Sequence, residues 1–557
     1  MDLKQTNHKI RGLALRSLCS LKFDGVTEYM QNALQESLND VDPYVKKTAI
    51  IGCVKFYHLS KSQFKKTEFL NSLYNLTKDN DPLVVINAIE AVNEIQADKG
   101  GLDIDRTLII PLLNRIKDFN EWGQSIILDI CSKYEPKDQQ EKFDIMNLLE
   151  DRFKHASSSV VLGTVKVFLH LTKDDTNLYK QVLQRLQAPL ITLMTSSETT
   201  ESYEISFNVL SHIHLLVIRG GNVYFENEYK QFFVKYDEPS YIKNIKLEIM
   251  GHIASENNIQ EIVNELSEYV TDVNADIAKR SIRCFGTIIV RLPAVSQNVT
   301  QQLRNFLSLR INYVTNATMM VLKDIFRKYT DFIEGFIPFF NKQSLDQITE
   351  TNGRAAFVWI LGQFGEQIDD SPYLLEKIIE EEQETGSTAL QTYLVTACTK
   401  LFFKRAPEMQ RILAKLFNHV MKQSTDSDLR QKVVFYYRLL QQDVRLAEQI
   451  INSSQDSLKD FTQFFEDAQS EKRERLFMEF NSLSVVYGKP SEKFLKDQAL
   501  KQSLASEKKY YPEGRGFKNA SAADQEKLLL ENEGPATANP EPATDLLDMG
   551  GPATSQT

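Results

Sequence analysis

Apolar residues recur every three or four positions along most of the chain, which is the spacing of an amphipathic helix. The segment around Leu13, Leu18 and Leu21 shows this pattern. Alternating apolar and polar residues bounded by hairpin turns, which indicate strands, are scarce. Over residues 1–490 a proline, which breaks helices, occurs about once per 45 residues. The pattern therefore predicts an almost entirely helical protein with one breaker for each pair of helices.

A short motif repeats at the length of a helix pair. It has an apolar residue followed, four positions later and in most copies, by a small one, as in Val45-Lys46-x-x-Ala49. In front of this copy stands Asp42-Pro43, where Asp can cap a helix start and Pro fits its first turn. Copies begin at residues 10, 45, 84, 160, 242, 277, 314, 390 and 429; five of the intervals between them are 35–39 residues, and the other three are about twice as long. Helix pairs of this size cannot bury their apolar faces alone and must stack.

We therefore predict an all-α fold, namely a HEAT/armadillo-type solenoid built as a superhelical stack of helix pairs. About twelve units should occupy residues 1–450, and residues 451–530 should form the end of the array and a partly ordered connection. Residues 531–557 should be a disordered, hinge-like Pro/Ala/Thr-rich tail, because no aromatic residue follows Gly534. The alternative, a set of unrelated helical domains with similar caps, leaves the regular spacing unexplained.

Composition and charge exclude several classes of protein. Hydrophobic residues make up 42% of the 557 residues, and the formal net charge of -10 disfavours a protein that follows nucleic-acid phosphates. The five cysteines are scattered without a CxxC pair, which favours buried thiols in a reducing compartment. The start lacks the apolar core of a signal peptide, and no apolar run approaches 18 residues. We expect a cytosolic or peripheral protein.

No group of residues forms a recognisable catalytic or metal-binding motif. GxxxxGK[ST], HExxH and GxSxG are all missing from the sequence. His212 and His214, two positions apart on a helix, should point to different sides and not share a metal ion. The acidic run at residues 376–384 could bind a cation, although a solvated helix face is the simpler interpretation. We therefore expect a non-enzymatic scaffold without catalytic, cofactor-binding or metal-binding residues.

Two segments are candidate binding sites. Residues 1–66 hold eleven basic and six acidic residues, and such an excess can orient a protein on an anionic membrane. The candidate residues of this anionic-membrane patch are Lys46, Lys47, Lys65 and Lys66, with ordinary solvated helix faces as the alternative. In the tail, the apolar cluster Leu546, Leu547, Asp548 and Met549 could dock into a groove as a short linear motif, with chance clustering as the alternative.

Motifs spread in order over residues 8–490 resemble those of the beta-adaptins, the large beta subunits of heterotetrameric adaptor protein complexes. They are Asp42–Ala49, Glu121–Gln124, Val160–Val167, Phe232–Tyr236, Ile311–Val314, Asp324–Tyr329, Arg354–Ile360, Tyr437–Leu440 and Val485–Lys489.

The resemblance also bears on the subtype. Ile10–Ser17 and Phe480–Leu483 lean toward the beta subunit of adaptor complex 4, a trans-Golgi coat that works without clathrin. Asp42–Ala49 and Phe326–Tyr329 are equally similar to the beta chains of the first and second complexes. Compared with the family pattern, we expect the N-terminal start of the trunk and the C-terminal appendage to be missing. The stretch from Leu546 to Met549 resembles a clathrin box, with Gly550 where an acid is expected.

The resemblance implies a coat scaffold subunit for vesicle-mediated protein transport and cargo sorting. The implied partners are a second large adaptin, medium and small adaptor chains, the membrane surface, clathrin and an Arf-type small GTPase, with no cofactor and no nucleic acid. The implied location is the cytoplasm, peripheral on trans-Golgi network and endosomal membranes and coated vesicles.

Three other functions remain as alternatives. The first is a beta subunit of a clathrin-associated complex of the first or second type, acting in clathrin-coated vesicle formation and endocytosis. The second is an importin-type nuclear transport solenoid, which the two tryptophans Trp122 and Trp359, without a Trp-Asn ladder, disfavour. The third is a regulatory HEAT scaffold of a phosphatase complex.

Overall fold

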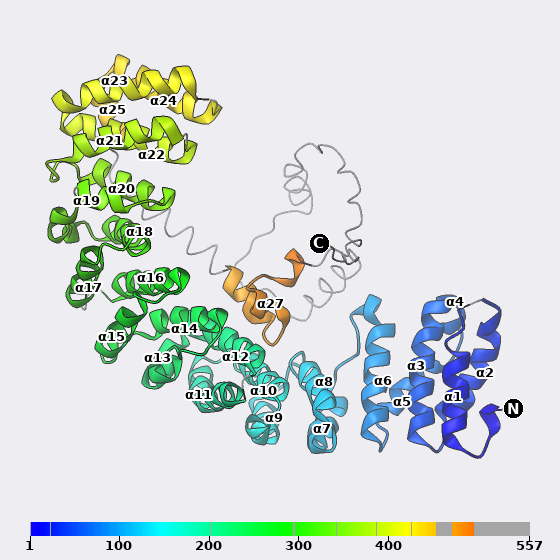
Figure 1. Cartoon of the computed structure of the whole chain (residues 1–557). Helices are drawn as coiled ribbons and strands as arrows, with labels where there is room; N and C mark the ends of the chain where they lie inside the picture. The colour runs from blue at the N-terminus through cyan, green and yellow to red at the C-terminus, as the bar shows by residue number, and fades with distance from the viewer. Residues whose placement is uncertain are drawn as a thin grey trace, which may run out of the picture. The chain divides into compact units, whose positions relative to one another are not determined.

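The computed structural model describes residues 2–452 and 471–494, apart from residues 23, 201, 293–295, 341, 386 and 425. Throughout these residues the regular secondary structure is helical (Figure 1). Residues 1–501 belong to one compact unit, and residues 502–557 to a second that lies wholly outside the described residues. No helix in the described part combines the length and the apolar character needed to cross a bilayer.

One set of helices forms a row in which each member contacts the next, and we call these the ladder helices (Figure 1). They are α1 (His8–Leu18), α3 (Pro43–Leu59), α6 (Pro82–Ile95), α8 (Glu121–Cys131), α10 (Ser158–Leu171), α12 (Tyr203–Leu216), α14 (Ser240–Ile253), α16 (Ala275–Arg291), α18 (Asn312–Lys328), α20 (Thr351–Phe364), α22 (Thr388–Lys404) and α24 (Ser427–Gln442).

A second layer packs on the ladder, for example α2 on α3, α11 on α12 and α23 on α24. Its longer members are α2 (Thr27–Leu38), α5 (Phe69–Leu76), α7 (Arg106–Asn114), α9 (Gln139–Leu149), α11 (Thr176–Thr199), α15 (Ile259–Tyr269), α17 (Ser296–Ser308), α21 (Ser371–Thr385) and α23 (Ala406–Gln423). The shorter helices are α4 (Lys61–Phe64), α13 (Asn222–Phe225), α19 (Lys342–Gln347), α25 (Val444–Ile451) and α27 (Leu483–Tyr487). Alternating helices in two stacked layers confirm the predicted HEAT/armadillo-type solenoid.

The repeated motif forms the start of ladder helices, as its residues predict. Asp42 caps α3, and its carboxylate accepts the backbone N–H of Tyr44 at 2.9 Å. Pro43 is the first residue of this helix, where its missing N–H costs nothing. Ala49, one turn later, is completely buried, because a small side chain allows neighbouring helices to approach closely. Asp81 caps α6 in the same way.

Basic side chains link the ends of successive ladder helices. Arg291, the last residue of α16, donates a hydrogen bond to the carbonyl oxygen of Gly251 in α14 at 3.0 Å. Lys328, the last residue of α18, donates to the carbonyl oxygen of Val290 in α16 at 3.0 Å. These contacts satisfy free carbonyl groups at helix ends and place positive charge at the negative end of the helix dipole.

Residues 471–494 do not continue the array beyond α25 but fold back onto its middle. Their helix α27 packs against α12, more than 260 residues earlier in the sequence (Figure 1). The rest of the predicted connection (453–470 and 495–530) and the predicted tail (531–557) lie outside the described residues.

Candidate functional site

The structure separates the four lysines of the expected membrane patch into two pairs. Lys46 and Lys47 lie in the first turn of α3, whereas Lys65 and Lys66 follow α4, beyond the other end of α3. Phe64, next to Lys65, packs against Phe56 near the end of α3, with 6.3 Å between ring centroids. Phe56 is nine residues, or about 14 Å along the helix, from Lys47. The two pairs therefore lie toward opposite ends of α3.

Lys46 forms an ion pair between two repeats of the array. Its ammonium group lies 2.8 Å from the carboxylate of Asp79, which precedes the next ladder helix, and its side chain is only 21% exposed. Burial would raise the pKa of Asp79, but the backbone N–H of Asp81 and the Lys46 ammonium outweigh burial and hold this pKa below its ordinary value. Lys46 is therefore a packing residue between two repeats.

A different set of residues on α3 forms a basic face. Lys47, Ile51 and Lys55 are spaced four residues apart, so their side chains leave the helix on the same side. Ile51 is 45% exposed and Lys55 is exposed, although both lie on a ladder helix. We call these three residues the α3 face. The spacing was visible in the sequence, but only the exposure of Ile51 distinguishes this side of α3 from its packed sides.

Part of the acidic run on α21 is paired with basic side chains of neighbouring helices. Arg354 on α20 lies 3.2 Å from Glu381 and 3.5 Å from Glu382, whose side chain is 7% exposed. Lys415 on α23 lies 3.1 Å from Glu376. The expectation of a solvated face is therefore wrong for part of the run, because the adjacent repeats supply basic partners.

The histidines and cysteines take separate structural positions. His212 hydrogen-bonds residue 481 of the returning segment, whereas the imidazole of His214 lies 3.9 Å from Glu248 on α14. The described residues contain no group of three or more His, Cys, Asp or Glu side chains that could hold a metal ion. The five cysteines are free and buried, which confirms the expected buried thiols.

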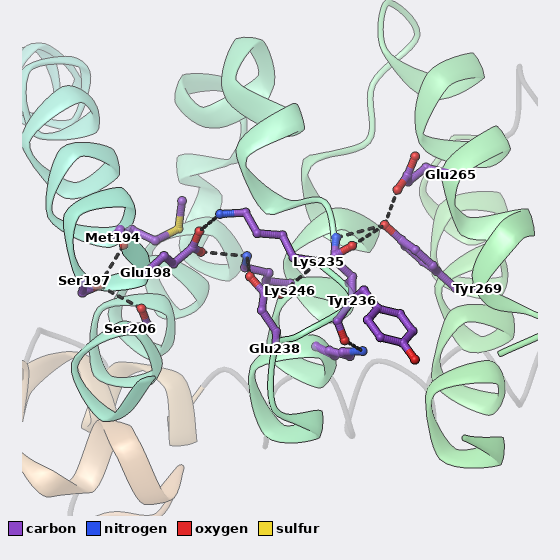
Figure 2. Close-up of polar contacts among 12 residues, drawn as sticks. Met194, Ser197, Glu198, Ser206, Lys235, Tyr236, Glu238, Lys246, Glu265 and Tyr269 are labelled. Atoms are coloured by element: carbon purple, nitrogen blue, oxygen red, sulfur yellow. Dashed lines mark hydrogen bonds and ion pairs between the residues drawn. The ribbon is translucent and has the colours of Figure 1, made fainter. Parts of the chain in front are cut away.

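The turn before α14, residues 233–239, is held by a buried ionic cluster that sequence reasoning missed (Figure 2). Lys246 on α14 is completely buried, and its ammonium group lies 2.7 Å from Glu198 at the end of α11 and 2.5 Å from Glu238 in the turn. Lys235, also in the turn, lies 2.6 Å from Glu198. Two carboxylates thus face two ammonium groups, so the cluster is neutral despite its burial.

Further hydrogen bonds hold the same turn. The backbone N–H of Val234 donates to the hydroxyl of Tyr269 on α15 at 2.9 Å, and Tyr269 in turn donates to Glu265 (Figure 2). Lys243 donates to the carbonyl oxygen of Tyr236 at 2.9 Å. The turn therefore presents the Tyr236 ring, which is 99% exposed, on a rigid support. Such an exposed, pre-positioned aromatic residue is a candidate contact for a partner protein.

One feature of the sequence could have indicated this cluster. Lys246 stands four positions after the first residue of the repeated motif, where Ala49 and Ser281 stand in other repeats and are completely buried. A lysine at a buried position requires a partner of opposite charge. Its partner Glu198 is 48 residues earlier in the chain, so the pairing itself depends on the tertiary structure.

Comparison with known proteins identifies the family of the chain. Residues 1–444 match the family described as the adaptin N-terminal region. The chain belongs to this adaptin family. A solved-structure comparison with a homology model of the full-length AP-3 complex gives a TM-score of 0.52 at 16% identity, covering 81% of this chain and 80% of that one. At that identity the similarity supports the fold alone.

Among full-length sequences, this adaptin resembles beta subunits. It is 41% identical to beta-adaptin-like protein A of Arabidopsis thaliana, over 88% of this chain and 59% of the relative. It is 35% identical to the AP-4 complex subunit beta of Dictyostelium discoideum, over 92% of this chain and 64% of the relative. It is 33% identical to the AP-1 complex subunit beta-1 of Mus musculus, over 89% and 52%. The chain thus spans between half and two thirds of the length of these relatives.

Proposed function

We propose that this chain is the beta-type large subunit of a heterotetrameric adaptor complex and acts as a coat scaffold, without enzymatic activity, in vesicle-mediated protein transport. The observation that carries this proposal is the family match over residues 1–444, together with beta subunits among the relatives. The two-layer array supports it, since an extended stack offers long surfaces to several partners at once. The partners would be a second large adaptin and the medium and small chains.

Purification of the tagged full chain under native conditions, followed by mass spectrometry, tests this proposal. We expect the other three adaptor chains in near-equal amounts. Recovery of nuclear transport cargo or of a phosphatase catalytic subunit, with no adaptor chain, would instead identify one of the alternative functions.

For the subtype, we propose the beta subunit of adaptor complex 4 on trans-Golgi network and endosomal membranes. The motifs Ile10–Ser17 and Phe480–Leu483 and the 35% identity to the Dictyostelium AP-4 subunit favour it. The similarity to the mouse AP-1 subunit keeps the first and second complexes as the alternative. The medium chain recovered in the same purification decides between them.

We further propose that the α3 face contacts an anionic membrane. Changing Lys47 and Lys55 to Glu should weaken binding to phosphatidylserine-containing vesicles by at least about tenfold, because each basic residue near such a surface contributes about 1 kcal/mol. The same charge change at Lys65 and Lys66 is the matched control, and we expect an effect of about threefold or less. Vesicle flotation at low and high salt measures both effects.

Binding by the α3 face should also fall with added salt, because counterions screen attraction at the surface. Equal losses for the two lysine pairs would assign binding to overall charge and not to the α3 face. Binding that is indifferent to salt and to both pairs would contradict membrane contact through this region.

Clathrin and an Arf-type small GTPase are the remaining proposed partners. The clathrin-box-like residues Leu546, Leu547, Asp548 and Met549 lie outside the described residues, and Gly550 removes one expected acidic contact. We expect a peptide of residues 541–553 to bind the clathrin terminal domain with a dissociation constant on the order of hundreds of micromolar, or about 5 kcal/mol. Changing Leu546, Leu547 and Met549 to Ala should abolish saturable binding. Equal, non-saturating signals from both peptides would contradict the motif.

A further inference from the structure

Residues 471–494, which we call the strap, contact the middle of the array through a few well-defined side chains. Phe480 is 2% exposed and packs edge-on against the buried imidazole of His212, with 4.6 Å between ring centroids. Phe477 covers the guanidinium group of Arg219, whose central carbon lies 3.5 Å from the ring centroid. Arg219 belongs to a π-helical turn, Val217–Gly221, directly after α12. An aromatic pair and a cation–π contact therefore hold the strap on α12.

An ion pair fixes the orientation of the strap. Two nitrogens of Arg219 each donate to one carboxylate oxygen of Glu474 at 3.0 Å, which is a bidentate arrangement. Residues 471–478 are helical, so Glu474 and Phe477, three positions apart, share one side of the helix. The contact surface on α12 and Val217–Gly221 thus fits an acidic residue followed by aromatic residues three and six positions later.

His212 supplies a hydrogen bond that exists only when its imidazole is neutral. Its Nε2 accepts the backbone N–H of Asn481 at 3.0 Å. The other nitrogen, Nδ1, lies 2.7 Å from the carbonyl oxygen of Asn208 and must therefore carry the proton and donate it. Asn481 has a positive φ of 59°, a conformation that Asn tolerates better than most residues, and this turn directs its N–H at the ring. Protonation of Nε2 would place two N–H groups against each other.

We propose that α12 and the turn Val217–Gly221 form a peptide-docking site, which the strap of the same chain occupies and can leave, and that docking requires neutral His212. The contacts favour the strap as the occupant, because its Glu474, Phe477 and Phe480 fit Arg219 and His212. When the strap is docked, the chain that continues after residue 494 is anchored at α12 and not at α25. When the strap is released, the chain would be anchored only at the end of the array.

The direction of the pH effect follows from the burial of His212. Burial lowers the pKa of docked His212 to about 4, whereas an undocked imidazole exposed to water titrates near 6.5. The docked state therefore binds fewer protons, so docking is at full strength above pH 6.5 and weakens as the pH falls from 6.5 toward 4. At pH 5.5 the docking equilibrium should be about tenfold weaker than at pH 7.5.

Other charged groups near the strap act in the same direction. Burial lowers the pKa of both His214 and His252 to about 4, and each of these two pKa values is lowered further by Arg473 of the strap. Their protonation would repel Arg473. On the neighbouring helices, Glu248 lies beside His214, and Arg291 contributes to the low pKa of His252. Protonation of Glu474 would remove its ion pair with Arg219, but the Glu474 carboxylate is half-exposed at the edge of the contact between the strap and the array.

Hydrogen–deuterium exchange of the full chain, corrected for the intrinsic pH dependence of exchange, tests the proposal. Peptides covering residues 476–485 should be protected at pH 7.5, and their protection should fall about tenfold at pH 5.5. In His212→Gln the side-chain carbonyl still accepts the Asn481 N–H and does not titrate, so most of this pH dependence should disappear. Adding Arg473→Gln should remove the remainder.

Two further variants keep the test decisive if His212→Gln perturbs packing. His170 on α10 is a partly buried histidine, and burial lowers its pKa to about 4 as well. His170→Gln should retain the tenfold change. Glu474→Lys changes only the strap, at the edge of its contact with the array. It replaces the ion pair with Arg219 by a repulsion and should lower protection of residues 476–485 at both pH values by about threefold or more. An unchanged tenfold pH effect in a folded His212→Gln protein would overturn the dependence on His212. Unprotected strap amides at pH 7.5, or no loss of protection in Glu474→Lys, would overturn docking itself.

Discussion

Replacing Lys246 with Met should destabilise the middle of the array by about 3–5 kcal/mol. The substitution keeps most of the side-chain volume but removes the ammonium group that lies between Glu198 and Glu238. Glu238 would then be a buried carboxylate without its cation, and such an unpaired charge is costly in a poorly hydrated interior. Because repeat arrays unfold locally, hydrogen exchange of α14 and the urea midpoint should both report the loss.

Lys235 provides a matched control for this prediction. It also pairs with Glu198, but its side chain is 55% exposed, so Lys235→Met should cost less than about 1 kcal/mol. Changing Glu198 and Glu238 to Gln in the Lys246→Met protein should recover part of the stability, since no charge would then remain buried and unpaired. Equal losses from Lys246→Met and Lys235→Met would show that the buried cluster contributes no more than a surface ion pair.

A second large loss is expected from Phe326→Ala, at about 3–5 kcal/mol. Phe326 on α18 is completely buried, and its ring lies 5.7 Å from Phe336, 6.3 Å from Phe340 and 5.9 Å from Phe364, measured between centroids. These rings come from the segment after α18 and from α20. Truncation would leave a cavity at the junction of two repeats, which the surrounding rings can fill only in part.

Exchange of the amides of α18 and α20, together with the urea midpoint, measures the loss at Phe326. Phe435→Ala on α24 removes a ring that is 54% exposed and should cost less than about 1 kcal/mol. If Phe326→Ala were no more destabilising than Phe435→Ala, the aromatic cluster would not support the junction between the repeats.

Most of the fold could be predicted because its signals are local. Asp42 and Pro43 lie next to the helix that they begin, and apolar residues at helical spacing determine which side of each helix is buried. The motif with Ala49 recurs at intervals of 35–39 residues or about twice that, so each unit that carries it can be recognised without knowledge of its neighbours. The return of residues 471–494 to α12 could not be predicted in this way, because no local pattern indicates a contact with His212 and Arg219.

The candidate surfaces depended more strongly on tertiary contacts. Lys46 and Lys47 are adjacent in the sequence, yet Lys46 pairs with Asp79 of the next repeat while Lys47 lies on the α3 face. Whether a lysine pairs with the next repeat is thus decided by that repeat and not by the local sequence. The role of Lys246 required even more distant information, since its partner Glu198 is contributed by α11.

By itself, the sequence determined the helical class, the repeat length, the caps and the resemblance to beta-adaptins, because each of these depends on residues within one or two helical turns or on ordered motifs. The tertiary structure alone decided which charges are buried in pairs, which side of α3 is open, and where the strap docks. The physical reason is that charge pairing and side-chain burial depend on distance in space. Stacking of the repeats brings Lys246 to Glu198, and the fold-back of residues 471–494 brings Asn481 to His212, across 48 and 269 residues respectively.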